Sequence, residues 1–309
     1  MRTADCTRLL LLAAIWGASF LLMRVVAPAI GAVPTAFLRV AFATAGLAAI
    51  LCALRTRWDF RSRFGTTLAL GVVNSGLPFL MYALAARLLP AGYSAIFNAT
   101  TPLMGVLIGA LFFGEPATWR QGAGVALGIA GVVLLTAVGP VALTPAVAAG
   151  AAACLVATAC YGVAGFLARR WITDRGGLDA RLVAFGSQAG AALVLAPFFA
   201  TSLATSAAPA GGTAWHAAAP AVWGALAALG LVCTAWAYIL YFRLIADIGP
   251  VRTLSVTFLI PPFGVLWGAL LLGEPLSWAH AAGGGLIALA VGLVLGAPKA
   301  AAPVHPRGA

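Results

Sequence analysis

The sequence from Pro102 to Trp119 reads PLMGVLIGALFFGEPATW, and the sequence from Pro261 to Trp278 reads PPFGVLWGALLLGEPLSW. Eleven of these eighteen positions are identical at a constant offset of 159 residues. Each copy is an apolar run with a proline at its start and a Gly-Glu-Pro turn at its end, and another apolar run follows. A self-match at a fixed offset indicates an internal duplication, and these two copies indicate two homologous halves.

The composition predicts that lipid surrounds most of the chain. Hydrophobic residues make up 63% of the 309 residues and charged residues only 8%, with a mean hydropathy of +1.04. A soluble domain carries about 25% charged residues, so a water-exposed surface could not be covered. A span needs about twenty mostly apolar residues, and it must be helical because an open strand would leave backbone groups unpaired in lipid. Ten segments meet this condition: 8–28, 33–54, 66–88, 92–113, 119–138, 147–170, 181–203, 219–243, 252–272 and 278–297.

The basic residues predict how these spans are oriented. With the N-terminus in the cytoplasm, fifteen of the eighteen basic residues fall in cytoplasmic tails and loops, and only Arg24, Arg39 and Arg87 do not. The positive-inside rule therefore predicts a multi-pass protein of the plasma (inner) membrane with both termini cytoplasmic. The first span is long for a secretory signal and is expected to stay uncleaved.

The number of spans in each half predicts an inverted duplication. Residues 8–138 and 147–297 each contain five spans, and an odd number turns the second half upside down relative to the first. We therefore predict an all-α polytopic membrane protein with ten transmembrane helices arranged as two inverted five-helix repeats. This architecture is typical of secondary transporters, whose substrate site lies near the membrane midplane between the repeats.

Several further motifs resemble a known family. They are WGASF at Trp16–Phe20, Pro34 with Arg39, the paired Gly-Glu-Pro turns, and the stretch from Tyr238 to Pro261. Together they are similar to EamA-type members of the drug/metabolite transporter superfamily. The resemblance implies a plasma-membrane carrier built from two inverted EamA units, often an exporter of amino acids or related metabolites. It does not specify the substrate.

Polar and aromatic side chains inside the spans are candidates for substrate binding. Buried amides and hydroxyls need partners in lipid, which a cavity with water and substrate can supply, as can hydrogen bonds between helices. An intramembrane arginine such as Arg39 is a functional candidate because it is costly, although it could instead snorkel to the headgroups or brace a helix end. Trp and Tyr near span ends can also be interface anchors. The candidate set is Trp16, Arg39, Asn74, Tyr82, Asn98, Tyr161, Gln188, Thr234, Trp236, Tyr238 and Tyr241.

The repeated motif contributes two further pairs of residues. Pro102 and Pro261 are candidate helix breaks or gating elements, because an intrahelical proline frees backbone groups; a tolerated packing kink is the alternative. Glu115 and Glu274 are interpreted as structural turn residues. We expect each to cap the helix that the next proline opens, and a proton-coupling pair is the alternative.

The function predicted from these features is secondary-active export of a small metabolite, an amino acid or related compound, by alternating access at a central cavity. A drug or toxic-compound efflux carrier is the alternative. A membrane-embedded enzyme or an adaptor without transport is less well supported, because the histidines are isolated and an adaptor has no need of two inverted halves. The protein is therefore not expected to be an enzyme.

The expected ligands follow from the residues that the chain has and those that it lacks. The chain contains no GxxxxGK[ST] motif and no clustered metal ligands, so no nucleotide, metal or other cofactor is expected. Its basic residues are dispersed, which argues against nucleic acid. The expected partners are a small-molecule substrate and the lipid bilayer. Small-residue faces such as 122–124 and 283–285 predict close helix packing within one chain, with a homodimer as the alternative.

Overall fold

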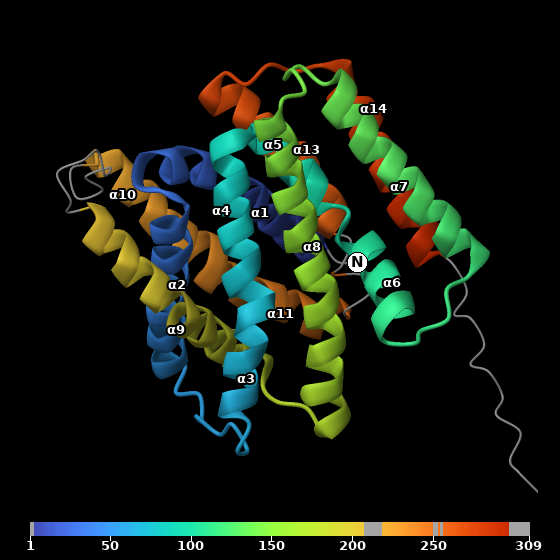
Figure 1. Cartoon of the computed structure of the whole chain (residues 1–309). Helices are drawn as coiled ribbons and strands as arrows, with labels where there is room; N and C mark the ends of the chain where they lie inside the picture. Colours follow the sequence, from blue (N-terminus) through green and yellow to red (C-terminus); the bar gives the residue numbers. More distant parts are fainter. Residues whose placement is uncertain (1–2, 207–217, 250–252, 254–255, 297–309) are drawn as a thin grey trace, which may run out of the picture.

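The computed structural model describes residues 3–206, 218–249, 253 and 256–296, and every structural statement below concerns this part of the chain. It is a bundle of helices without a strand in the described ranges (Figure 1). The helices of the first half are α1 (Thr3–Ile30), α2 (Ala32–Ala53), α3 (Phe64–Gly71), α4 (Leu77–Leu88), α5 (Ala91–Asn98), α6 (Thr101–Phe112) and α7 (Trp119–Val138). Those of the second half are α8 (Pro145–Trp171), α9 (Ala180–Ser206), α10 (Pro220–Ala227), α11 (Ala237–Ile248), α13 (Val256–Leu272) and α14 (Trp278–Leu295).

These helices match the ten predicted spans. Eight continuous helical units are long and apolar enough to cross a membrane, and α5 with α6 forms a ninth that bends by 44°. The tenth, α13, is a shorter apolar helix of 17 residues. The predicted span 252–272 and the predicted loop 204–218 lie partly outside the described residues.

The two Gly-Glu-Pro turns lie at opposite ends of the bundle. They precede α7 and α14, which pack side by side (Figure 1). A methyl group on Gly124 would meet the carbonyl oxygen of Ala290, whereas one on Gly131 would lie 2.8 Å from that of Gly283. Residue numbers therefore rise along α7 as they fall along α14, so the two helices are antiparallel. The predicted inversion of the second half is confirmed, and these glycines pack within one chain.

Both turns have the same backbone geometry. Gly114 and Gly273 each have φ of +65°, a left-handed conformation that glycine adopts without strain. The next residue in each copy, a glutamate, donates its N–H to the carbonyl of the glycine six residues earlier, at 3.0 and 3.1 Å. The repeated sequence therefore specifies the same turn in both halves.

The predicted role of the two glutamates as caps of the following helices is wrong. At α7, Thr118 Oγ1 accepts from the Gln121 N–H at 3.3 Å, and Gln121 Oε1 accepts from the Thr118 N–H at 2.8 Å. At α14, the Ser277 N–H donates to His280 Nδ1 at 3.2 Å. These pairs complete the helix starts, and neither helix begins at the proline after the glutamate. The two carboxylates are therefore available to bind other parts of the chain.

Two π-helical segments occupy equivalent positions in the two halves. They are η1 (Val72–Gly76), between α3 and α4, and η4 (Ala228–Trp236), between α10 and α11. The offset of 159 residues places η1 on residues 231–235, inside η4. Because π-helical segments are rare and occur often at functional sites, this pair marks a region of interest.

The outward surface is apolar. Leu111, Phe112, Trp119, Leu270 and Trp278 are between 62% and 78% exposed, and all lie at or next to the ends of spans. A protein in water would bury such side chains, whereas hydrocarbon and the membrane interface solvate them. The fold is therefore that of a multi-pass membrane protein.

Candidate functional site: a cavity between the two halves

A cavity of about 280 Å³ lies between helices of both halves. Helices α1, α2, η1, α4, α5 and α6 contribute its walls from the first half, and α8, η4, α11 and α13 do so from the second. The structure brings nine of the eleven predicted substrate residues into these walls: Trp16, Arg39, Asn74, Tyr82, Asn98, Tyr161, Thr234, Tyr238 and Tyr241.

The two π-helical segments bring polar side chains to the cavity wall. Asn74 of η1 and Thr234 of η4 both line it, and so does Cys233, the repeat counterpart of Asn74. The hydroxyl of Thr234 donates to the carbonyl of Leu229 at 2.9 Å, so it satisfies a backbone acceptor inside its own π-helical segment. Each π-helical segment therefore contributes polar side chains to the cavity wall.

Arg39 is the charged side chain of the cavity. It projects from α2 and is only 5% exposed. Its Nε donates to Thr234 Oγ1 at 3.1 Å, and Nη1 lies 3.4 Å from the sulfur of Met23. The guanidinium carbon stands 3.6 Å from the ring centroid of Phe79, within the range of a cation–π contact. The side chain is therefore fixed inside the protein, and it does not snorkel to the headgroups.

Aromatic rings form much of the remaining wall. Trp16 of α1 and Tyr241 of α11 pack with centroids 5.4 Å apart, across the two halves. Tyr82 lies 6.3 Å from Tyr161, and its hydroxyl donates to Asn98 Oδ1 at 2.9 Å. The cavity therefore combines apolar ring faces with a few fixed polar groups, which is the usual chemistry of small-molecule sites.

Two predicted residues lie elsewhere. Gln188 is fully buried on α9, where its Nε2 donates to Ser75 Oγ at 2.7 Å, so it holds two helices together. Trp236 is 43% exposed on the outward face of η4, where lipid would contact it. Sequence reasoning missed several lining residues. Three of them, Ser19, Phe20 and Met23, could have been found from their helical spacing after Trp16.

A wider vestibule of about 740 Å³ adjoins the cavity on the side of Glu115. We call it the Glu115 vestibule; it is lined by α6, α8, the start of α13, the end of α14 and residues 115–121. Thr101, Tyr161 and Thr257 line both spaces, so the two are neighbours. At its rim Glu115 Oε1 lies 3.4 Å from Arg169 Nη1, and both side chains are more than half exposed.

The proline candidates of the two halves have different settings. Pro102 lines the Glu115 vestibule in the first turn of α6, after the bend that separates α5 from α6. Pro261 lies within α13, which runs through it and Pro262 without interruption from Val256. The duplicated proline therefore accompanies a break in the first half, whereas α13 is unbroken at the equivalent position.

The opposite end of the cavity is closed by close packing, which we call the Glu274 seal. The Glu274 carboxylate accepts from the backbone N–H groups of Ala91 (2.8 Å) and Gly92 (3.4 Å), at the N-terminus of α5 in the other half. A methyl group on Gly264 of α13 would collide with Ala95 of α5. By contrast Gly105, the repeat counterpart of Gly264, has nothing within 4 Å of its missing side chain. Gly264 is therefore tightly packed at the Glu274 seal, whereas its counterpart Gly105 borders open space in the Glu115 vestibule.

Comparison with known proteins decides the family. The sequence profile of the EamA-like transporter family matches residues 6–137 and 148–296. The chain belongs to this family. The two matched segments correspond to the two repeats that the sequence motifs indicated.

One curated relative of this EamA transporter is described as a probable terminal-alkyne amino-acid exporter of Streptantibioticus cattleyicolor. It is 27% identical over 185 residues, a match that spans 60% of this chain and only 57% of the relative. A protein of known crystal structure superposes on 95% of this chain and 96% of its own, with a TM-score of 0.64 and 21% identity. That likeness supports the fold.

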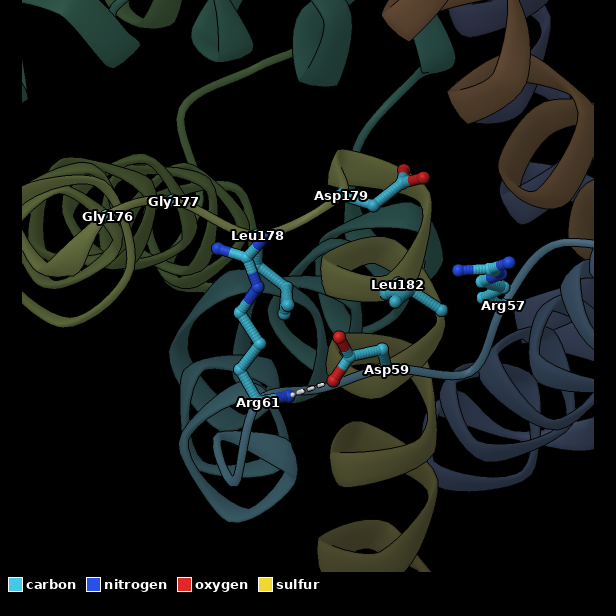
Figure 2. A pocket seen from close by; sticks show the side chains of 8 residues that line it. All are labelled: Arg57, Asp59, Arg61, Gly176, Gly177, Leu178, Asp179 and Leu182. Carbon is cyan, nitrogen blue, oxygen red and sulfur yellow. Dashed lines mark hydrogen bonds between the residues drawn. The ribbon is translucent and has the colours of Figure 1, made fainter.

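A separate hollow of about 350 Å³ lies on the surface of the EamA transporter, where the loop 54–63 meets the loop before α9 (Figure 2). Asp59 Oδ1 accepts from the Arg61 N–H at 2.9 Å, and Asp179 pairs with Arg181 at 2.7 Å. Hydrogen bonding from Arg181 lowers the pKa of Asp179. Asp179 is thus paired with an arginine side chain and Asp59 with a backbone N–H, and the hollow lies between two loops, separate from the central cavity.

Proposed function

We propose that this protein is a secondary-active transporter that exports a small metabolite, an amino acid or related compound, by alternating access. The proposal rests on a difference in packing between the two ends of the cavity, which equivalent parts of the two repeats form. The Glu274 seal closes one end of the cavity, while the Glu115 vestibule leaves the other end open. An inverted repeat can exchange these two states when its halves, residues 8–138 and 147–297, rock about the central site.

The open end faces the cytoplasm in this proposal. Arginine-rich segments gather there: Arg63 donates to the carbonyls of Gly177 (3.0 Å) and Arg175, which ties the loop after α2 to the loop after α8. Arg8 pairs with Asp247 at 2.8 Å, where the start of α1 meets the end of α11. The positive-inside rule assigns this end to the cytoplasm of the plasma (inner) membrane. Substrate would enter from inside, as an exporter requires.

The size of the cavity suits a small metabolite. It holds about 280 Å³, at the lower limit of the range of about 300–1,000 Å³ for ligand pockets. The curated relative described as an amino-acid exporter supports the same class. No nucleotide-binding motif occurs in the sequence, so we propose that an ion or solute gradient drives transport.

A reversible cross-link across the Glu274 seal tests the proposal. The Cβ position of Gly92 lies 3.6 Å from the Cβ of Val265, within the separation that a disulfide bridges. In a variant without native cysteines, Gly92→Cys and Val265→Cys would be introduced together and the protein reconstituted in liposomes. Counterflow of a panel of labelled amino acids should stop on oxidation and return on reduction.

Each single-cysteine variant is the matched control and should be insensitive to oxidant. Persistent flux in the fully cross-linked protein would contradict alternating access. Absence of flux for every compound, in the reduced and unmutated protein alike, would contradict transport of this class of substrate.

A further inference from the structure

Arg39 carries a positive charge that no acidic residue of the chain balances. All seven acidic residues are among the described residues, and none forms an ion pair with Arg39. Its two hydrogen-bond partners, a threonine hydroxyl and a methionine sulfur, are neutral, and Nη2 has none in the described part of the chain. A buried cation without a counter-ion is costly, so an arginine in this setting needs an anion from elsewhere.

The rest of the cavity does not supply that anion. The other lining residues are aromatic rings, amides, hydroxyls, a thiol and aliphatic side chains, all of which are neutral. The nearby acids lie at the two ends: Glu274 is engaged by the N-terminus of α5, and Glu115 lies at the exposed rim. The cavity therefore has a net charge of about +1, since guanidinium stays protonated in proteins.

We propose that Arg39 is the anion-binding group of the cavity and that the transported compounds are small monocarboxylates, amino acids among them. This rests on the proposed function, because it names the substrate class. Guanidinium binds a carboxylate through two parallel hydrogen bonds. A single cation balances one negative charge, so a phosphate dianion would bring a second charge without a partner. A cationic drug would place like charges together.

The surroundings of Arg39 prepare it for this role. Thr234 holds Nε and the Phe79 ring lies against the guanidinium plane, so little side-chain freedom is lost on binding. The packed rings of Trp16 and Tyr241 offer an apolar surface for the organic part of the substrate. An ammonium group could rest on the tyrosine faces, but the cavity offers it no carboxylate. The carboxylate is therefore the group that the site selects.

Acid–amide pairs test the proposal by direct binding to the purified protein in detergent. The probes are 3-phenylpropionate with 3-phenylpropanamide, 4-methylpentanoate with 4-methylpentanamide, and L-phenylalanine with L-phenylalaninamide, measured by calorimetry. At least one acid should bind about 10-fold or more tightly than its amide, as loss of a charged hydrogen-bond partner implies. Arg39→Gln should abolish this preference, whereas Arg39→Lys should keep part of it. Arg87→Gln, at an exposed arginine of α4, is the matched control and should behave as wild type.

Folding of Arg39→Gln would be checked by size exclusion and circular dichroism. Should it fail to fold, Thr234→Val keeps the charge of Arg39 but removes the acceptor of its Nε, together with the hydrogen bond to the Leu229 carbonyl, and a few-fold loss of acid preference is expected. An acid preference that survives in Arg39→Gln overturns the proposal, and so does an undiminished acid preference in Thr234→Val where that is the variant that folds. So does equal binding of acids and amides, or no binding of any acid.

The transport assay separates this proposal from the proposed function. Efflux of a neutral or cationic compound that is equally fast in wild type and Arg39→Gln would leave transport standing and refute the carboxylate site. Carboxylate binding that depends on Arg39 without flux of any compound would leave the site standing and refute transport.

Discussion

Closure of the Glu274 seal depends on the absence of a side chain at Gly264. A Cβ at this position would collide with Ala95 across the contact between α13 and α5, whereas Gly105 has open space. Adding a methyl group to a well-packed contact costs about 1–3 kcal/mol, which changes the ratio of two conformations by about 5- to 150-fold. We expect Gly264→Ala to depopulate the described conformation by this factor, because only the closed seal contains the collision.

Reporter cysteines in a variant without native cysteines measure this shift. Val106→Cys lies in the Glu115 vestibule, and Val265→Cys lies in the Glu274 seal against Gly92. With Gly264→Ala, labelling by a membrane-impermeant maleimide should slow at Val106→Cys from the vestibule side. It should accelerate at Val265→Cys from the opposite side.

Gly105→Ala is the matched control, since it makes the same change in the other repeat. Both substitutions raise helix propensity by about 1 kcal/mol, so a difference between them reports the collision. Gly105→Ala should leave the described conformation populated, and adding Ala95→Gly to Gly264→Ala should restore wild-type labelling. Equal labelling in the Gly264→Ala and Gly105→Ala variants, or a failure of Ala95→Gly to restore it, would refute this reasoning.

Three further predictions concern the repeated turns. Glu274→Gln weakens the capping of α5 and should destabilise the seal by about 1–2 kcal/mol. This should appear as faster maleimide labelling of Val265→Cys. Glu115→Gln, at a carboxylate that is half exposed, should leave that labelling rate unaltered. Epitope tags inserted after Gly114 and after Gly273 should report opposite compartments, and tags on one side would contradict the inverted fold. Thr118→Ala removes the capping box of α7 and should cost about 1 kcal/mol, read as a lower midpoint of thermal unfolding in detergent.

Much of the architecture could be predicted because the membrane restricts it. The span length and the need to satisfy backbone groups leave few alternatives, and the offset of 159 residues revealed the duplication. The cavity residues were predicted less completely. Trp236 and Tyr238 lie two residues apart and look equivalent in sequence, yet one faces outward and the other lines the cavity. Two residues along a helix rotate the side chain by about 200°, so one of the two must face away from the cavity, and the packing of the two halves decides which.

The partners of Glu274 could not be predicted from local sequence. The proline after it suggests a helix start, and helix dipoles favour a carboxylate there, so a local cap was the reasonable expectation. In the structure the helix that it caps is α5, from the other half of the chain. Such a contact depends on how the halves pack together, and a motif of three residues contains no information about that.

The two glutamates make the strongest case that the duplication serves a change of conformation. Their turns are the same in backbone geometry, and each glutamate lies near an arginine of the other half, Arg24 or Arg169. Glu274 also binds two backbone N–H groups of that half, whereas Glu115 is half exposed. Local sequence does not explain this difference, because the sequence around both is nearly the same. If the halves exchange settings, each glutamate stabilises closure at its own end, and the cavity with Arg39 is open to only one side of the membrane at a time.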